Sequence, residues 1–421
     1  MKRNALLEAC ATLIKEKVND YFFKRQHRKT PKDFTRNRLL GFGAVILIML
    51  NFKTKSNSLS TYNYMVEMEN SESVSRQAYE AARDRVKSSA FRELHEDTVQ
   101  MSLAVDDPIT FCGFRVCPID GTLVFMPKSE ALARKYGPTT PVQGKTYARI
   151  SLCVDVLNGV ILDGEISAFS TGERKLAMMH IEKNLHPSLL YLFDRGYWDP
   201  KLIAAMCVRG QKFLVRLAKN SVPELIHRTE DSGNFVLKHK GKHKGKQYAL
   251  RYYKFELPNG EMEYLATNVS PEEIPDSQLP ALYALRWGIE TKYDELKNRL
   301  QFEGFSGKSV NVIEQEFYAS MVVMNLTGFA ILAADGKVKA KREGKENRHE
   351  YKPNGNMAAG ILKDRLLRAI IADDPEVRSK MLDKLVNDIS KFVIPIKPNR
   401  HNPRSLTKAK HRRTRRILCP L

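Results

Sequence analysis

The 421-residue sequence lacks the residue patterns that mark common zinc and disulfide sites. No two of its six cysteines form a CxxC pair, and it contains no HExxH motif. The cysteines are Cys10, Cys112, Cys117, Cys153, Cys207 and Cys419. A zinc hydrolase and a disulfide-stapled secreted domain are therefore disfavoured, and we interpret the cysteines as thiols in a reducing compartment.

Long apolar runs are also scarce. The strongest run covers residues 39–52, between Arg38 and Lys53. A membrane-spanning helix needs about 20 apolar residues, so we interpret this run as a core helix. No signal peptide precedes the first helix-like segment. The expectation is a cytoplasmic protein without a membrane partner.

Acidic residues are outnumbered by basic ones, 48 against 69, which gives a formal net charge of +21. Such a surplus favours nucleic acid as a partner, whereas an anionic membrane or a merely solvated basic surface remains an alternative. The 43% hydrophobic content is sufficient for a sizeable core, and the length indicates two or three domains.

Residues 1–105 form a helical, basic region that we expect to bind DNA. Within it, residues 73–83 have helix-turn-helix character, because a serine cap and small residues precede several cations. The cations placed to face DNA are Arg76, Arg83, Arg85 and Lys87. An ordinary amphipathic helix with a charged face explains the same pattern equally well.

Residues 106–335 contain short apolar strands followed by alternating helices and strands, which indicates an α/β domain with a mixed sheet. Residues 218–272 interrupt this rhythm as a β-rich insertion with a basic run at 238–246. Residues 336–421 are predicted to be a helical C-terminal region. Its tail from Lys391 has ten lysines and arginines and no acid, which is typical of a nucleic-acid-binding arm.

Two aspartates follow apolar strands of the α/β domain. Asp120 comes after the strand predicted at 114–119, and Asp194 comes after the strand predicted at 189–193. Functional groups concentrate where strands of such a sheet end, and two carboxylates joined by a third can hold two Mg²⁺ ions. Each aspartate taken alone also fits a turn or a helix cap.

The third carboxylate is Glu290, in a helix predicted at 277–301. Tyr283, Arg286, Glu290 and Lys297 are spaced by three, four and seven residues, which places them on one helix face. The carboxylate suits a metal ion, the two cations suit phosphates, and the phenol suits a phosphate or a base. The alternative is a surface helix with an Arg286–Glu290 ion pair.

These four residues resemble a family signature, Tyr-x2-Arg-x3-Glu-x6-Lys, of the insertion-sequence-four family of DDE transposases. Four specified residues at fixed spacing match by chance at roughly one position in 10⁵. The sequences at 119–122, 193–197 and 263–268 also resemble the family. The resemblance covers about residues 30–335, and the basic tail is typical as well.

The resemblance implies an RNase-H-like catalytic domain in which Asp120, Asp194 and Glu290 bind two Mg²⁺ ions, with Mn²⁺ as a substitute. Tyr283, Arg286 and Lys297 would bind DNA. The implied activity is cut-and-paste DNA transposition: metal-dependent cleavage and strand transfer of double-stranded DNA. The implied substrates are the terminal inverted repeats of a mobile element and a target, held by a homodimer.

A hairpin intermediate in some relatives uses an aromatic pocket in the insertion. Trp198 and Trp287 are the only tryptophans, and neither lies in residues 218–272. The other aromatic candidates there are Tyr248, Tyr252, Tyr253 and Phe255.

Rival interpretations are less well supported. Residues 304–309 are similar to a phosphate-binding loop, but Phe302 stands where that loop needs its first glycine. An inactive DNA-binding descendant would not need all three carboxylates. A structure-specific nuclease of the same fold, without strand transfer, remains a rival, and an assay that supplies a 3′-OH end distinguishes it.

Overall fold

The computed structural model describes residues 1–51, 56–69, 74–137, 145–183, 186–218, 220–238, 246–257, 260–345 and 349–396. Most of the basic run at 238–246 and the tail beyond residue 396 lie outside these residues. The helices are α1 Leu6–Asn19, α2 Tyr21–His27, α3 Phe42–Leu50, α4 Asn57–Glu67, α5 Arg76–Asp84, α6 Ser89–Leu103, α7 Glu130–Tyr136, α8 Glu173–Lys183, α9 Pro200–Val208, α10 Pro223–Ile226, α11 Leu279–Ala284, α12 Gly288–Asp294, α13 Val310–Arg342, α14 Gly355–Ile371 and α15 Pro375–Lys391.

The strands are β1 Arg115–Met126, β2 Thr146–Asp155, β3 Val160–Ala168, β4 Leu189–Phe193, β5 Lys212–Leu217, β6 Ser232–Lys238, β7 Gln247–Glu256, β8 Met262–Thr267, β9 Tyr351–Pro353 and β10 Val393–Pro395. Short 3₁₀ segments are η1 Arg3–Ala5, η2 Arg195–Tyr197, η3 Asp276–Gln278 and η4 Leu285–Trp287, and a π-helical segment is η5 Glu295–Arg299.

One mixed sheet organises the chain, with the strand order β3-β2-β1-β4-β5-β8-β7-β6. β2 is antiparallel to both β1 and β3, whereas β4 and β5 continue parallel to β1. This is the strand arrangement of an RNase-H-like domain, so the predicted fold class is confirmed. The predicted insertion is β-rich as well, and β8 joins β6 and β7 to the edge of the same sheet.

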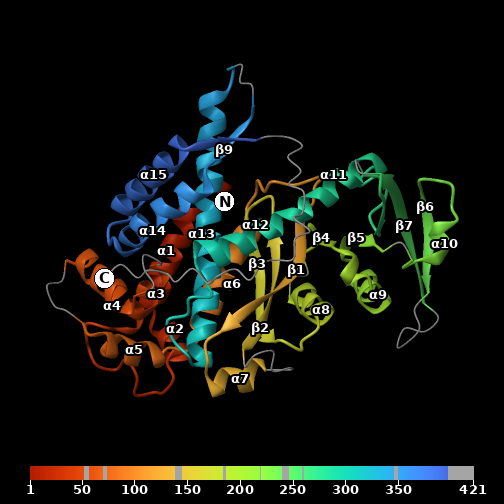
Figure 1. Cartoon of the computed structure of the whole chain (residues 1–421). Helices are drawn as coiled ribbons and strands as arrows, with labels where there is room; N and C mark the ends of the chain where they lie inside the picture. Colours follow the sequence, from red (N-terminus) through yellow and green to blue (C-terminus); the bar gives the residue numbers. More distant parts are fainter. Residues whose placement is uncertain are drawn as a thin grey trace.

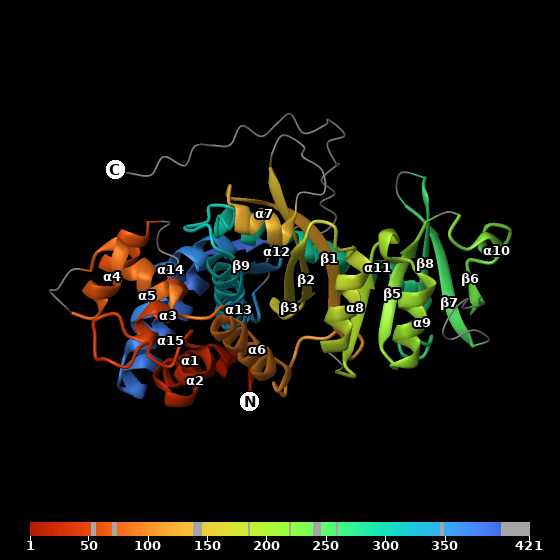
Figure 2. The same cartoon turned by 90° about the horizontal axis from the view of Figure 1, so that it is seen from below.

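The helical regions gather at one end of the molecule. α1 to α5 lie beside α14 and α15, while β6, β7 and α10 lie at the opposite end, with the central sheet between them (Figures 1 and 2). Lys15 of α1 donates to the Ile371 carbonyl at 2.6 Å, and Arg378 of α15 donates to Thr12 at 3.1 Å. Residues from the two ends of the sequence therefore build one helical body.

α13 is the central helix of the core. It is long and apolar enough to span a membrane, but 89% of its most apolar stretch is buried within the protein. It packs against β3 and α6 on one side and α15 on another. Asn325 exchanges hydrogen bonds with the backbone of Ile161 on β3, at 2.8 and 3.1 Å. α13 is therefore a buried core helix that joins the sheet to the helical body.

Two sequence predictions about local structure were wrong. The strand predicted at 114–119 continues to Met126 as β1, so Asp120 lies within a strand and not after it. The helix predicted at 277–301 is interrupted by η4 and η5. Long-range packing decided the course of β1, because β2 pairs with it from Ile119 to Met126.

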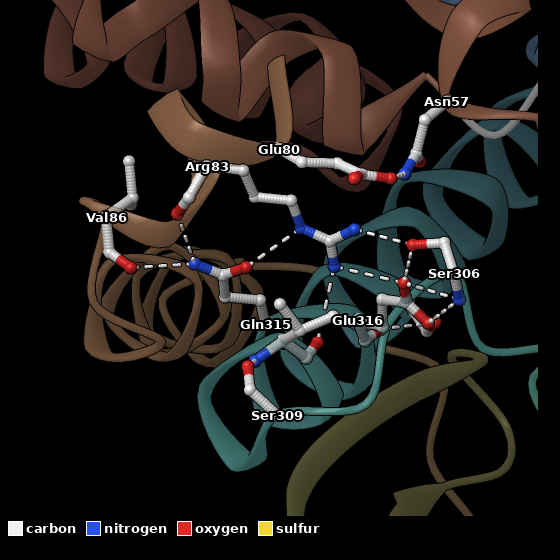
Figure 3. A network of polar contacts seen from close by, with 10 residues as sticks. Asn57, Glu80, Arg83, Val86, Ser306, Ser309, Gln315 and Glu316 are labelled. Carbon is white, nitrogen blue, oxygen red and sulfur yellow. Dashed lines mark hydrogen bonds and ion pairs between the residues drawn. The ribbon is translucent and has the colours of Figure 1, made fainter. Parts of the chain in front are cut away.

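Arg83 of α5, one of the cations predicted to face DNA, is instead buried, with an exposed side-chain fraction of 4%. Its guanidinium donates to Gln315 at 3.0 Å, to Ser306 at 2.6 Å and to Glu316 at 3.0 Å (Figure 3). Gln315 in turn donates to the Arg83 and Val86 carbonyls. This network attaches the N-terminal helices to α13 and to the segment that precedes it.

Arg83→Ala is expected to lower the free energy of unfolding by about 3–5 kcal/mol, because Glu316 would keep a nearly buried charge without its cation. The matched control is Arg76→Ala on the same helix. Arg76 pairs with Glu80 at the surface, where a pair is worth less than about 1 kcal/mol. Denaturant unfolding of both variants measures the difference, and equal losses would contradict a buried ion pair that holds α5 in place.

Candidate active site

The two predicted aspartates lie at the same level of neighbouring parallel strands. The pairing of β1 with β4 ends at Pro118 opposite Leu192, and Asp120 and Asp194 each follow two residues later. Side chains alternate along a strand, so both aspartates lie on the face that Leu192 occupies, where α11 packs. The two aspartates therefore lie on one face of the sheet, just beyond the point where the two strands separate.

Each aspartate is held locally by a backbone hydrogen bond. The Asp120 carboxylate accepts from the Gly121 N–H at 2.8 Å, and the Asp194 carboxylate accepts from the Gly196 N–H at 2.8 Å, where it caps η2. Because these bonds fix the carboxylate positions, the site is ordered before any ligand binds.

Arg286 lies between Asp120 and Glu290. Its guanidinium nitrogens are 4.0 Å from an Asp120 carboxylate oxygen and 3.9 Å from a Glu290 oxygen. The Arg286 side chain is 8% exposed and lies 4.7 Å from the Trp287 ring centroid, whereas Glu290 is 49% exposed. The structure thus places Asp120 and Glu290 around one cation, with Glu290 open to solvent.

The surroundings of Asp120 change its acid–base behaviour. Burial raises the pKa of Asp120 to about 6, and the nearby charges of Asp194 and Glu173 act in the same direction. The Gly121 N–H and Arg286 oppose the shift without cancelling it. A desolvated carboxyl beside other acids is a characteristic of functional sites, because a cation would relieve the repulsion.

Tyr293 fixes the backbone at Asp120, a role that the sequence did not reveal. Its hydroxyl donates to the Asp120 carbonyl at 2.6 Å and accepts from the Leu152 N–H at 3.1 Å. Gly288, earlier on α12, allows the helix to approach β2, because an added Cβ would lie 2.8 Å from a Val156 methyl. The only sequence signal was a tyrosine three residues after Glu290.

A second contact holds the same carbonyl from the opposite face of the sheet. Ser151 donates to the Asp120 carbonyl at 3.2 Å, and His180 of α8 lies 3.0 Å from Ser151 and 2.6 Å from Asp163. Burial acts to raise the pKa of Asp163, but His180 and Lys183 outweigh it and lower that pKa to about 2. The Asp163 carboxylate is therefore ionised and can orient His180.

Glu173 is a fourth acid near the site that the motif did not include. It stands at the start of α8 and pairs with Arg149 of β2. A Cβ on Gly121 would lie 3.1 Å from its side chain, so the glycine allows this close approach. Glu173 contributes negative charge beside Asp120 while Arg149 neutralises part of it.

The remaining predicted site residues have packing roles that the spacing did not foresee. Tyr283 is buried, and burial raises its pKa to about 12. Lys297 donates to the Thr122 hydroxyl at 2.6 Å and to the Leu123 carbonyl at 2.8 Å, so it ties η5 to β1. The interruptions at η4 and η5 rotate these residues relative to one regular helix.

The aromatic candidates of the insertion divide into two groups. Tyr252 is buried and donates to the Glu230 carbonyl at 3.4 Å, so it belongs to the core. Tyr253 and Phe255 stack with ring centroids 5.9 Å apart and pack on the side of the sheet that Tyr283 covers. Only this second pair lies on the same face as the aspartates.

The donor chemistry of the three carboxylates fits a hard divalent cation, since every ligand atom would be oxygen. In the described part of the chain, however, no three histidine, cysteine or acidic side chains are close enough together to enclose an ion. The three carboxylates thus match a divalent cation in their donor atoms, and the two aspartates share one face of the sheet. The Arg286 guanidinium lies between the Asp120 and Glu290 carboxylates.

Comparisons with known proteins identify the family of the segment that contains these residues. A family model described as "Transposase DDE domain" matches residues 112–326, about half of the chain. The matched segment contains Asp120, Asp194 and Glu290 and ends within α13.

Two individual proteins are similar. The transposase InsG for insertion sequence element IS4 from Escherichia coli (strain K12) is 21% identical over 268 residues, which is 60% of this chain and 60% of that protein. The match therefore spans about 60% of the length of that relative. A cryo-EM structure of the piggyBac transposase synaptic complex with hairpin DNA covers 90% of this chain and 84% of that chain, with 11% identity and a TM-score of 0.47.

Asp120→Asn is expected to stabilise the metal-free protein at high pH. The pKa of Asp120 rises from 3.8 to about 6 on folding, so the folded state binds the proton more tightly. The contribution of this proton to the free energy of unfolding is fully present below pH 3.8 and is lost as the pH rises through 6. Asparagine does not ionise, so the variant avoids this loss of stability. For a pKa shift of about two units the loss is at most about 3 kcal/mol.

The measurement is the free energy of unfolding against pH in the presence of a chelator. The gain of Asp120→Asn should be large at pH 8 and should vanish towards pH 4. Asp294→Asn, which changes an exposed carboxyl on α12, is the matched control for net charge. A gain that is independent of pH would contradict the raised pKa.

Proposed function

Because the chain belongs to the family defined by the Transposase DDE domain, we propose that it is a DNA transposase that cleaves and rejoins DNA at the ends of a mobile element. The observation that carries the proposal is the common level of Asp120 and Asp194 on two parallel strands, with Glu290 across the Arg286 guanidinium. The three carboxylates come from segments far apart in the sequence, and their convergence on one metal site is part of the proposal.

Asp120, Asp194 and Glu290 are proposed to hold divalent metal, Mg²⁺ with Mn²⁺ as a substitute. Two such ions, when bound, would activate the attacking oxygen and stabilise the leaving oxygen of a phosphodiester. The desolvated state of Asp120 supports this role, because a cation would remove the cost of its negative charge. Arg286 must then move away from one carboxylate, which frees its guanidinium for a phosphate.

Arg286 and Lys297 are proposed to bind phosphates of the DNA end. The Arg286 fork matches the oxygens of a phosphate, and the packing of its plane near Trp287 and Tyr283 limits the orientations it can take. Tyr283 is buried, so we assign it chiefly to positioning Arg286, with its hydroxyl at the edge of the site. Lys297 holds β1 and adds positive charge beside Thr122.

The proposed substrates are double-stranded DNA with terminal inverted repeats, and a target DNA. The helical region of residues 1–105 is proposed to bind the repeats, residues 106–335 to perform the chemistry, and residues 336–421 to add further DNA and protein contacts. Cleavage at two paired ends requires two sites, so a homodimer is proposed for the DNA-bound state. The net charge of +21 supports association with DNA, and the proposed location is the bacterial cytoplasm at the nucleoid.

Glu290→Gln is expected to abolish nicking in Mg²⁺ while DNA binding stays within a few-fold of wild type, because an amide is a poor ligand for a hard cation. Arg286→Ala and Lys297→Ala should weaken both engagement of the end and strand transfer. Asp294→Asn on the same helix is the matched control and should retain activity. The assay measures end binding, first-strand nicking and joining of a supplied 3′-OH end separately.

Wild-type nicking by Glu290→Gln would remove the metal role of this carboxylate. Nicking without joining by the wild-type protein would instead favour a nuclease.

Tyr293→Phe is expected to raise the Mg²⁺ concentration needed for half-maximal nicking several-fold, because the Asp120 backbone loses its 2.6 Å hydrogen bond. Tyr136→Phe is the matched control, since the Tyr136 hydroxyl is buried and has no hydrogen-bond partner among the described residues. Both variants lose one buried hydroxyl. An unchanged Mg²⁺ requirement for Tyr293→Phe would show that the contact is only structural.

A further inference from the structure

A large cavity lies in the N-terminal helical region, and none of the three carboxylates lines it. It is an open groove of about 940 Å³ between the 31–40 segment and α5. Its cationic lining residues are Lys32, Arg36, Arg38 and Arg85. No described residue that lines the groove is acidic. The groove is thus large, open and of one charge sign.

α5 presents two different faces to its surroundings. Ala78 and Ala81 form the floor of the groove and are exposed, and Arg85 lines the groove just after the helix ends. The short alanine side chains leave the space above this floor open. Tyr79 and Arg83 are buried on the opposite face, where Arg83 reaches Ser306 and Glu316 (Figure 3). The floor of the groove is therefore fixed to the segment that follows the helix bearing Glu290.

We infer that this groove binds the phosphodiester backbone of DNA and that the Arg83 network fixes the bound DNA relative to the carboxylates. Charge complementarity determines the occupant, because four cations and, among the described residues, no acid line the groove, and a lining of this charge attracts a polyanion and repels the basic segments of this chain. The inference rests on the proposed function, and it specifies where the duplex contacts the helical region.

The cations are available for such contacts. Lys32, Arg36 and Arg38 are all exposed, and the Arg85 side chain is 47% exposed. Arg85 lies 3.7 Å from Asp33, a distance that leaves only a weak ion pair. Phosphate contacts of this kind position a duplex without reading its sequence, so the groove should bind DNA of any sequence.

The test compares two triple variants of the full-length chain. Lys32→Ala/Arg36→Ala/Arg38→Ala removes three groove cations, and Lys128→Ala/Arg134→Ala/Lys135→Ala removes three exposed cations on α7 and just before it. The probe is a short mixed-sequence DNA duplex, and the readout is the slope of log K against log salt concentration. If each groove cation contacts a phosphate, the slope should fall by up to about 2.7, at about 0.9 per contact. The control should leave it unchanged.

A second pair of variants removes no cation. Ala78→Glu places an anion on the groove floor, and Ala131→Glu adds the same charge to an exposed alanine of α7. Ala78→Glu should weaken DNA binding about tenfold or more, whereas Ala131→Glu should change it little. Thermal unfolding of each variant confirms that the fold is retained.

Equal slopes for the two triple variants, or equal affinities for the two glutamate variants, would overturn the groove assignment. These outcomes differ from those expected if the proposed function is wrong. If it is wrong, the wild-type protein itself would neither bind nor nick DNA, and no variant would differ from it.

Discussion

β1 and β4 run parallel and separate after Pro118 and Leu192, and this separation determines where the two aspartates lie. While the strands are hydrogen-bonded, their side chains on this face are apolar and covered by α11. Beyond that point the face is open, and Asp120 and Asp194 occupy the first positions that point into the opening. The third carboxylate depends on the same geometry, because Tyr293 attaches α12 to β1 and β2 at Asp120.

The rest of the molecule keeps this arrangement rigid. α13 is buried behind the sheet and joins β3 to helices from both ends of the chain. Arg83 and Glu316 attach the N-terminal helices to the beginning of α13, immediately after the segment that contains Glu290. A duplex held against α5 would therefore have a fixed orientation relative to the carboxylates. The charges of Asp194 and Glu173 help to raise the pKa of Asp120, and a cation bound at the proposed site would offset this repulsion.

The sequence predicted those features that depend on local pattern. β4 has the predicted bounds, residues 189–193, since a short apolar run between polar turns is a strong local signal. The spacing of Arg286 and Glu290 predicted that the two side chains lie on one helix face, and their charged ends are 3.9 Å apart. By contrast, the continuation of β1 through Asp120 depends on pairing with β2, about 30 residues later in the chain.

The contacts that cross the molecule could not be predicted from local pattern. The burial of Arg83 depends on Ser306, Gln315 and Glu316, more than 220 residues away, so its positive charge alone indicated a surface role. The hydrogen bonds of Tyr293 and Lys297 to β1 are equally non-local. The charge-lined groove likewise arises only when the 31–40 segment and α5 come together.

The central claim is that Asp120, Asp194 and Glu290 act as one metal site, and iron-directed cleavage of the polypeptide tests it most directly. Fe²⁺ occupies oxygen-rich divalent sites, and with ascorbate and peroxide it cuts the backbone close to where it is bound. We predict cuts near residues 120, 194 and 290 together, all suppressed by excess Mg²⁺ and all lost in Asp120→Asn. Cuts at only one of these segments, or cuts that persist in Asp120→Asn, would contradict a shared site.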